Sequence, residues 1–505
     1  MYALKKVLFI KNALVLTATA LLLRLAGIIF KVWLAAKIGS EGIGLYQLVI
    51  SLYVLVSTFA TGGISTAVTR MVTDELALGS GKGALRVLKK GIAISLLLAT
   101  ASLAVTFFGA DFLAKTVLGD LRAAPAIKIL GFSLPFMGIS SCIRGYFMAR
   151  RKTLSSGLSQ ILEQTVRILI VVALSVHFAE RGLSFACAAV LFGDTVAEAV
   201  SCAVLYLSMR ADRRKIIKTG KQPLPHGIHK IIHISLPITS GKYLNSALRT
   251  AENVIMPKAL AAFGAAASAL SQFGMIKGMA LPLLFFPSSF LNSVSTLLIP
   301  EMGEALSCGQ KYKIKYITQK VMTITSASSF LLAGIFFSLS YTLGNLIYSS
   351  TEVGYLLRVL APIVPLMYID SMCDGMLKGL DQQGFIFRIS VLDSALRIVL
   401  ILFIVPRFGM NGFLFIMVIS NLFTAALRVS RLLLISEVGF DTTRWVIKPL
   451  LFSFLACAPI VVFKSLSLPT LIFTVVSVAV TCAIYVLLCF AGGCVSTDDL
   501  TDLFK

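Results

Sequence analysis

The sequence has little charge for its length, and that charge is uneven in sign. Asp, Glu, Lys and Arg make up 14% of the 505 residues, with 46 basic against 23 acidic side chains, while 57% of the residues are hydrophobic. With a mean hydropathy of +0.90, this composition excludes a water-soluble globular protein. A polytopic membrane protein is predicted. The positive-inside rule accounts for the basic excess, so no nucleic-acid partner is expected.

Motifs of nucleotide-driven and hydrolytic enzymes are absent from the sequence. It contains no P-loop, no G-x-S-x-G motif and no hydrophilic segment long enough for a nucleotide-binding domain. An ATP-driven pump and a glycosyltransferase are therefore disfavoured, and neither enzymatic activity nor a cofactor is expected. The nine cysteines show no C-x-x-C spacing, and the histidines at 226, 229 and 233 have no neighbouring acidic or thiol ligand. No metal site is predicted.

Apolar runs of about 20 residues recur along the chain, each long enough to cross about 30 Å of hydrocarbon as a helix. We count about fourteen of them, which predicts an all-α fold of about 14 transmembrane helices. The basic loops place the N-terminus in the cytoplasm, and an even number of spans places the C-terminus there too.

A repeat with an offset of 230 residues divides the chain. The matching positions are Glu163 and Arg167 with Asp393 and Arg397, Gly145 with Gly375, Gly182 with Gly412, Ser65 with Ser295, and Gly79 with Gly309. Each copy holds six predicted spans, so both copies enter the membrane from the same side as parallel six-helix bundles. Repeats of this kind place a substrate site between halves that rock against each other, which indicates a transporter.

Four segments are expected from this pattern. An N-terminal six-helix bundle covers 1–208, and a basic cytoplasmic linker covers 209–230. A C-terminal six-helix bundle covers 231–436. Two additional transmembrane helices and a cytoplasmic tail make up 437–505.

Charged side chains inside the predicted spans cost about 3 kcal/mol each at the bilayer centre, so most of them must face the protein interior. Opposite charges three or four residues apart can neutralise each other on one helix. The pairs are Glu163 with Arg167, Asp393 with Arg397, and Arg249 with Glu252. We interpret them as structural ties between helices, with membership of a gate as the alternative.

Arg24 and Lys31 have no acidic partner on their own helix. Arg24 and Lys31 lie seven residues apart, hence on one helical face about 10 Å apart, and Lys242 and Arg249 repeat that spacing. With Lys277 they predict a cavity that attracts phosphate or carboxylate. The alternative is that they reach the membrane surface or pair with the acids Asp194, Glu198, Asp370 and Asp374.

Seven motifs carry a resemblance to a known family. Those of the first half are Lys37-Ile-Gly-Ser-Glu-Gly-Ile-Gly-Leu-Tyr-Gln47, Arg144-Gly-Tyr-Phe147 and Ser159-Gln-x2-Glu163-Gln-x2-Arg167. Those of the second half are Arg249-x2-Glu252-Asn-x3-Pro257, Gly278-Met-Ala-Leu-Pro282 with Phe286-Pro287, Pro300-Glu301 and Lys378-Gly-Leu-Asp-Gln-Gln383. By them the chain resembles the multidrug/oligosaccharidyl-lipid/polysaccharide exporter superfamily. Within it the chain is similar to the polysaccharide exporter branch that contains stage V sporulation protein B and is related to lipid II flippases.

The resemblance implies a V-shaped pair of six-helix bundles around a central cavity, alternating access, and a lipid-linked cell-wall precursor as cargo. Basic residues on the first and eighth helices then contact the precursor's pyrophosphate. Arg24 is the best positional match, and Lys31 and Lys277 match approximately. The two terminal helices correspond to those that form a lateral groove for a lipid tail.

The predicted function is a flippase that moves a lipid II-like undecaprenyl-pyrophosphate glycan across the bacterial cytoplasmic membrane. The residues expected to bind the pyrophosphate are Arg24, Lys31, Arg249 and Lys277, and the candidate ligands of a coupling ion are Asp194, Asp370 and Asp374. Expected partners are the lipid-linked oligosaccharide, membrane lipids and cell-wall synthesis enzymes, with the protein acting as a monomer. The alternatives are a cation-coupled multidrug exporter of the same superfamily and a non-transporting scaffold for cell-wall or spore-envelope synthesis.

Overall fold

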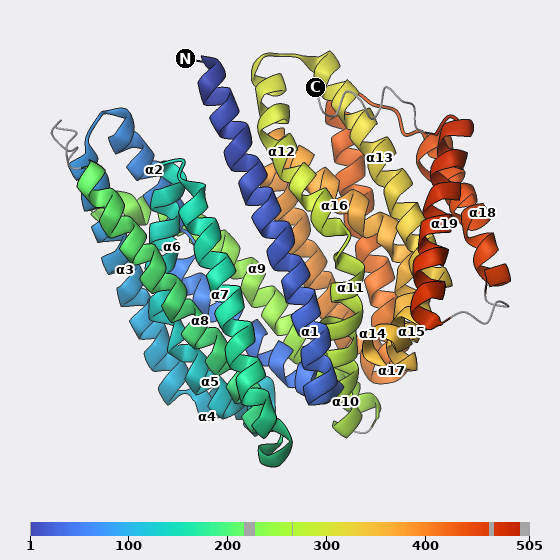
Figure 1. Ribbon diagram of the computed structural model, residues 1–505, viewed down its shortest axis with the longest axis horizontal. Coiled ribbons are helices and arrows are strands. Elements are labelled where there is room, and N and C mark those ends of the chain that lie inside the picture. Colours follow the sequence, from blue (N-terminus) through green and yellow to red (C-terminus); the bar gives the residue numbers. More distant parts are fainter. Residues whose placement is uncertain (1, 217–227, 265, 464–468, 495–505) are drawn as a thin grey trace. The chain divides into compact units, whose positions relative to one another are not determined.

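Helices form all the regular structure in the described part of the chain. The computed structural model describes residues 2–216, 228–264, 266–463 and 469–494 (Figure 1). Most of the expected linker, residues 217–227, and the tail from 495 onward lie outside these ranges. The predicted all-α polytopic fold is confirmed.

The number of membrane spans depends on how broken helices are counted. Nine described helices are long and apolar enough to cross a membrane, or up to eleven if each of two bent helix pairs is one span. This count treats Leu22–Ala77, which takes in most of α1 (Tyr2–Thr61) and all of α2 (Ile64–Ala77), as one helix. It also treats α17 (Gln383–Ser436) as one helix, although Gly39 and Gly409 break the helical backbones of α1 and α17. A helix of 54 residues would extend about 80 Å, far beyond the hydrocarbon thickness. The fourteen spans stay a prediction.

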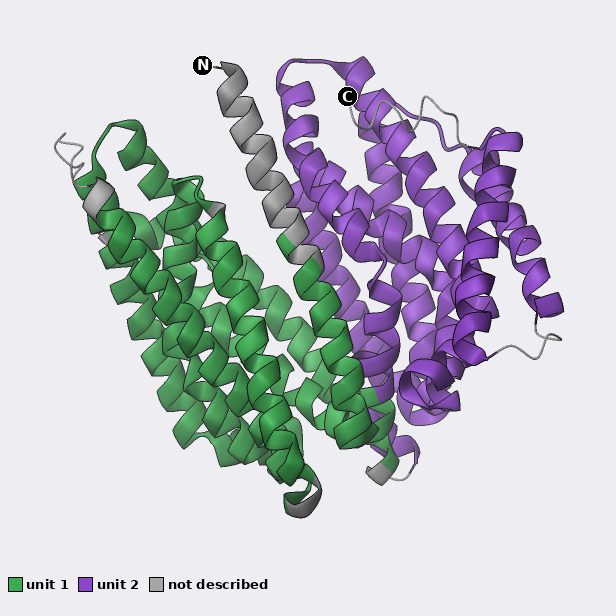
Figure 2. Ribbon diagram, in the orientation of Figure 1, with its two compact units in different colours: residues 1–258, 266–274 green, residues 259–265, 275–505 purple. Residues whose placement is uncertain are grey.

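Contacts divide the chain into two compact units, residues 1–258 with 266–274 and residues 259–265 with 275–505 (Figure 2). The helices of the first unit are α1, α2 (Ile64–Ala77), α3 (Gly81–Phe108), α4 (Ala110–Phe112), the π-helix η1 (Leu113–Leu118), η2 (Leu121–Ala123), α5 (Ala124–Gly131), α6 (Ser133–Ala149), α7 (Thr153–Leu174), η3 (Ser175–His177), α8 (Phe178–Ile216), most of α9 (Ile228–Phe263) and α10 (Ala266–Gly274). Its core includes Met71, Leu88 and Tyr146, which are fully buried where α2, α3 and α6 meet.

The second unit contains the remaining helices. They are the π-helix η4 (Met275–Ala280), α11 (Leu281–Phe285), α12 (Ser288–Ser307), α13 (Lys311–Ser338), α14 (Ser340–Tyr348), α15 (Thr351–Leu360), η5 (Ala361–Ile363), α16 (Val364–Gly379), α17, the π-helix η6 (Thr443–Ile447), α18 (Lys448–Phe463) and α19 (Thr470–Ala491). The last two helices are tied to α13, because Ser453 donates to the carbonyl of Phe330 at 2.8 Å and Tyr485 donates to that of Ala327 at 2.7 Å.

The helix α9 packs against the first unit, although the sequence placed residues from 231 onward in the second bundle. Ile231 is fully buried in the core of the first unit, and Thr250 donates a 2.9 Å hydrogen bond to the carbonyl of Ser51. These contacts group α9 up to Lys258 with the first unit. The other expected segment boundaries stay predictions.

Backbone geometry repeats at the offset of 230 residues. Three pairs of residues with positive φ are Gly79 (77°) with Gly309 (65°), Gly119 (79°) with Ser349 (50°), and Arg151 (56°) with Asp381 (57°). Left-handed residues end helices, so the breaks between helices recur at the same places in both copies. Between the first two breaks, α3 spans 81–108 and α13 spans 311–338.

The paired glycines allow two equivalent close helix crossings. A β-carbon at Gly145 of α6 would lie 2.7 Å from the carbonyl oxygen of Ser65, and one at Gly375 of α16 would lie 1.9 Å from the hydroxyl of Ser295. At the first crossing Ser65 donates to the carbonyl of residue 141, and at the second Ser295 donates to that of residue 371. The repeat seen in the sequence is thus a repeat of helix packing, with α2 on α6 and α12 on α16.

Candidate functional site

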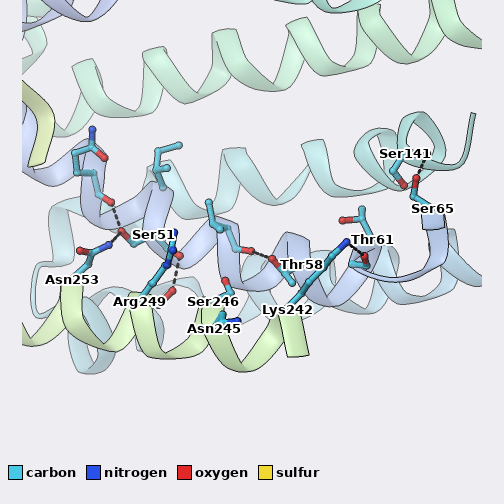
Figure 3. Close-up of a pocket in the computed structure, with 15 residues that line it drawn as sticks. Ser51, Thr58, Thr61, Ser65, Ser141, Lys242, Asn245, Ser246, Arg249 and Asn253 are labelled. Carbon is cyan, nitrogen blue, oxygen red and sulfur yellow. Dashed lines mark hydrogen bonds between the residues drawn. The ribbon is translucent and has the colours of Figure 1, made fainter. Parts of the chain in front are cut away.

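A cavity of about 650 Å³ lies in the first unit between α9 and the second half of α1 (Figure 3). Residues of α2 and α6 complete its wall. The lining residues are Gln47, Ile50, Ser51, Val54, Thr58, Thr61, Gly62, Ser65, Ser141, Lys242, Asn245, Ser246, Arg249, Thr250 and Asn253. Most of these side chains are polar, which is unusual for the wall of a membrane-embedded bundle.

The wall combines two polar helix faces. Its residues on α9 are 242, 245, 246, 249, 250 and 253, and those on α1 are 47, 50, 51, 54, 58 and 61. Spacings of three and four residues put each set on one side of its helix. The two faces line the same cavity, so hydroxyl and amide groups meet across it.

Hydrogen bonds hold one end of this wall in place. Ser51 is central, because its hydroxyl accepts from the amide of Asn253 at 2.9 Å and its carbonyl accepts from Thr250 at 2.9 Å. In the described part of the chain, the side-chain carbonyl of Asn253 and the hydroxyl of Ser246 are buried without a hydrogen-bond partner. Buried polar groups normally have partners, so these two atoms keep unused hydrogen-bonding capacity beside the cavity.

Two basic side chains give the cavity its charge. Lys242 donates to the carbonyl of Gly62 at 2.8 Å, and Arg249 lies exposed in the cavity wall. Among the described residues Arg249 has no hydrogen bond or ion pair, and no Asp or Glu lines the cavity. The cavity is therefore positively charged. A guanidinium in this setting suits a phosphate or carboxylate oxygen pair.

Only one of the four predicted pyrophosphate ligands lines this cavity. Arg249 does, whereas Arg24 lies exposed on α1 and Lys31 lies half-buried on the same helix, both outside the wall. Lys277 belongs to the second unit, on the π-helix η4, where its ammonium lies 5.7 Å from the ring centroid of Phe413. That separation is typical of a cation–π contact.

The predicted pair of Glu163 and Arg167 is formed, with 3.2 Å between charged atoms. It belongs to a larger cluster in the first unit. Arg144 of α6 lies 2.8 Å from Glu163, and Arg167 also contacts Asp194 of α8. Asp194, a candidate ion ligand, is thus held by a guanidinium, and the cluster ties three helices together.

The acids of α16 are paired in the second unit. Asp370 lies 2.8 Å from Arg428 of α17, and Asp374 contacts Lys378 and lies 3.8 Å from the same guanidinium. Both candidate ion ligands on this helix are therefore neutralised.

The other two predicted pairs are Asp393 with Arg397 and Arg249 with Glu252. Asp393 accepts a 2.5 Å hydrogen bond from Ser420, and Arg397 lies half-buried one turn further along α17. Glu252 is buried, whereas Arg249 is on the cavity face, and no ion pair joins these two among the described residues. A separation of three residues did not bring their charges together.

Two interior guanidiniums were missed from the sequence, those of Arg144 and Arg428. The repeat offers a signal for both, because the offset of 230 pairs Arg144 with Asp374 and Glu198 with Arg428. The uncharged part of the cavity wall was missed as well. Its signal is the spacing of Asn and Ser residues between 242 and 253.

An apolar groove of about 510 Å³ runs between α13 and α18 in the second unit. Its lining residues are Phe330, Ala333, Gly334, Phe337, Ser338, Pro362, Pro365, Leu450, Ser453, Phe454, Cys457, Ala458 and Val461. Its mostly apolar lining suits hydrocarbon better than polar groups.

The chain is similar to a known protein family, to curated proteins and to a solved structure. Residues 9–306 match the family model of polysaccharide biosynthesis proteins. The chain is 27% identical to stage V sporulation protein B of Bacillus subtilis (strain 168) over 413 residues, covering 80% of this chain and 79% of the relative. It is 21% identical over 420 residues to lipid II flippase MurJ of the same organism, covering 77% and 76%. Its fold resembles the solved lipid II flippase MurJ in an inward closed conformation, with a TM-score of 0.70, 15% identity and coverage of 97% and 100%.

Proposed function

Because the chain belongs to the polysaccharide biosynthesis protein family, in the polysaccharide exporter branch of the multidrug/oligosaccharidyl-lipid/polysaccharide exporter superfamily, we propose that it is a flippase for a lipid-linked glycan precursor. The cargo is an undecaprenyl-pyrophosphate glycan of the lipid II kind, and the membrane is the bacterial cytoplasmic membrane. Translocation proceeds by alternating access of the headgroup site, with both termini in the cytoplasm. The protein acts as a monomer, beside the enzymes that make and use the precursor.

The observation that carries this proposal is the charge of the cavity in the first unit. A pyrophosphate that leaves water loses its hydration, which is costly unless opposite charge replaces it. Arg249 and Lys242 supply that charge on α9, with no acid in the wall to compete. The hydroxyl of Ser246 and the amide of Asn253 suit sugar hydroxyl and N-acyl groups.

Three further basic residues are proposed to assist with the phosphates. Arg24 and Lys31 follow each other on one face of α1, and Lys277 projects from η4. The charges of Arg24 and Lys31 would extend the path of the pyrophosphate along α1, and Lys277 would contact it in the second unit. The apolar groove between α13 and α18 would take part of the polyprenyl chain.

The driving force is proposed to be the membrane potential or an ion gradient, since each charge that crosses is worth about 2.3 kcal/mol per 100 mV. Asp194, Asp370 and Asp374 remain the acids considered for an ion. A metal ion there would have to displace Arg167, Arg428 or Lys378 from them.

Two other functions fit the cavity less well. A multidrug exporter for lipophilic cations needs acids where the cargo sits, and the wall of this cavity has none. A non-transporting scaffold for cell-wall or spore-envelope synthesis has no use for a charged cavity in a bundle. Retained partner binding by a variant with a neutral cavity would favour the scaffold.

The deciding experiment measures translocation of lipid II in proteoliposomes that contain the purified protein. Arg249→Gln is expected to lower the rate at least tenfold, and Lys242→Gln is expected to lower it less, because that amine also bonds to Gly62. Lys258→Gln is the matched control, since this lysine of α9 bonds the carbonyls of residues 116 and 117 outside the cavity. An unchanged rate in Arg249→Gln with Lys242→Gln combined would overturn the site assignment.

A further inference from the structure

One buried acid beside the charge cluster of Arg144, Glu163, Arg167 and Asp194 is left over after the charges of that cluster are paired. Glu198 of α8 is 8% exposed, and its Oε1 atom has no hydrogen-bond partner. The charged and titratable groups around it come from four helices. They are Arg144 on α6, Glu163 and Arg167 on α7, Asp194 and Cys202 on α8, and Tyr53 on α1.

The guanidiniums of this cluster are already engaged. Arg144 donates to Glu163 and to Ser201, at 2.8 and 3.0 Å, and Arg167 contacts both Glu163 and Asp194. Two positive charges thus face three carboxyl groups. With all three ionised the cluster would carry one net negative charge, and an uncompensated buried charge costs several kcal/mol.

In the second copy of the repeat, a base occupies the position that corresponds to Glu198. Counting 230 residues on, Arg428 stands in the place of Glu198 and Asp374 in the place of Arg144. Arg428 lies between Asp370 and Asp374, and Lys378 adds a second positive charge. With Asp393 and Arg397, which correspond to Glu163 and Arg167, three acids and three bases occupy this part of the second copy. The acid without a basic partner therefore occurs at position 198 in the first copy, and the corresponding position 428 in the second copy holds a base instead.

We propose that Glu198 is a proton-binding site of the first unit. A proton on the carboxyl group cancels the surplus charge and turns an acceptor without a partner into a donor. The hydroxyl of Ser140, which is also buried without a partner, is a neighbour able to accept from it. A metal ion fits less well, because it needs about six oxygen ligands and guanidiniums hold Glu163 and Asp194.

The consequence for transport, which rests on the proposed function, is that protons are the coupling ion. Loss of the proton from Glu198 leaves a third negative charge among α6, α7 and α8. That charge attracts Arg144 and Arg167 away from Glu163 and Asp194. The packing of the three helices then depends on the proton, so a proton gradient would act on the first unit.

Infrared spectroscopy of the purified protein in lipid nanodiscs tests the site without any cargo. The wild-type protein is expected to show the carbonyl stretch of a protonated carboxyl group near neutral pH, and this band should disappear as the pH is raised. Glu198→Gln should remove the band, and Glu198→Asp should restore one at a shifted frequency. Glu41→Gln, which removes an exposed carboxylate paired with Arg122, should leave it unchanged.

Two results would overturn the proposal, namely a wild-type spectrum without a titrating band and a band that survives in Glu198→Gln. If Glu198→Gln does not fold, Glu198→Asp still decides, since an unshifted band assigns the proton elsewhere. In proteoliposomes an imposed pH gradient should change lipid II translocation by wild-type protein but not by Glu198→Gln. A full response in that variant contradicts proton coupling. The infrared result stands even if the Arg249 experiment refutes the cargo.

Discussion

The side-chain oxygens of Ser40 and Ser271 lie 2.5 Å apart, although 231 residues separate them in the chain. The helices α1 and α10 meet here backbone to backbone. A β-carbon at Gly274 would lie 2.0 Å from the carbonyl oxygen of Ser40, and one at Gly44 would lie 2.2 Å from that of Leu270. Contacts this close exist only because glycine has no side chain.

This contact predicts a cross-link. The double variant Ser40→Cys/Ser271→Cys should form a disulfide under mild oxidation, because sulfur atoms in place of the two hydroxyls lie within bonding reach. If alternating access requires α10 to leave α1, oxidation should stop lipid II translocation and reduction should restore it. Loss of two thiols to maleimide labelling measures the bond, and the single variants are the controls. A fully cross-linked protein that transports at the normal rate would contradict alternating access at this contact.

The crossing of α6 on α2 predicts a stability loss. Gly145→Ala places a β-carbon 2.7 Å from the carbonyl of Ser65, and overpacking of this kind costs about 1 to 3 kcal/mol. Thermal unfolding in detergent should show a lower midpoint for this variant.

Gly384 of α17 is the control for that change, since nothing lies within 4 Å of a β-carbon there. Gly384→Ala should leave the midpoint unchanged or raise it slightly, because alanine favours helix over glycine by about 1 kcal/mol. Equal midpoints for the two variants would refute the close crossing.

The ion pair between Arg428 and Asp370 predicts that loss of the guanidinium lowers the stability of the protein. Arg428 is 9% exposed, and Arg428→Gln would leave Asp370 and Asp374 with only Lys378 between them. Breaking a buried pair in this way costs about 3 to 5 kcal/mol.

A second change should recover much of that loss. The double variant Arg428→Gln/Asp370→Asn removes both members of the 2.8 Å pair, so no uncompensated charge remains. Thermal midpoints of the two single variants and the double variant measure the coupling. Additive losses would show that the two side chains do not interact.

The apolar groove predicts sensitivity to the length of the lipid tail. Ala458→Trp fills part of the groove between α13 and α18. Translocation of a precursor with the full undecaprenyl chain should slow several-fold, while a short-chain analogue should be carried at the normal rate.

The matched control for the groove is Leu455→Trp. Leu455 lies on the same helix and is 54% exposed, but it does not line the groove. Its replacement should affect neither substrate. Equal slowing of both substrates by Ala458→Trp would mean that the groove does not hold the tail.

Composition was sufficient to predict the helical membrane fold, because few soluble arrangements could bury so much apolar surface. The repeat also predicted which glycines are equivalent, since Gly145 and Gly375 perform the same packing task. The cavity was harder to foresee. Arg249 stood out as a charge, but Ser246 and Asn253 are common residues whose meaning depends on the face of α9 that they occupy.

Pairing between helices could not be predicted from one sequence. Arg428 and Asp370 are 58 residues apart, and no local spacing rule joins them. The place of α9 had the same difficulty, because a helix that follows a linker can pack on either side of it. Local rules found the bond between Glu163 and Arg167, whereas Arg144 needed the fold.

The chain passes from one unit to the other three times between Lys258 and Met275. Pro257, which interrupts the hydrogen bonding of α9, stands just before the first crossing, and the last crossing falls where the π-helix with Lys277 begins. π-helical turns are rare and are frequently found at functional sites. Lys277 thus lies at the start of the chain segment that leaves the first unit for the last time, and a rotation of that segment would turn the lysine with it.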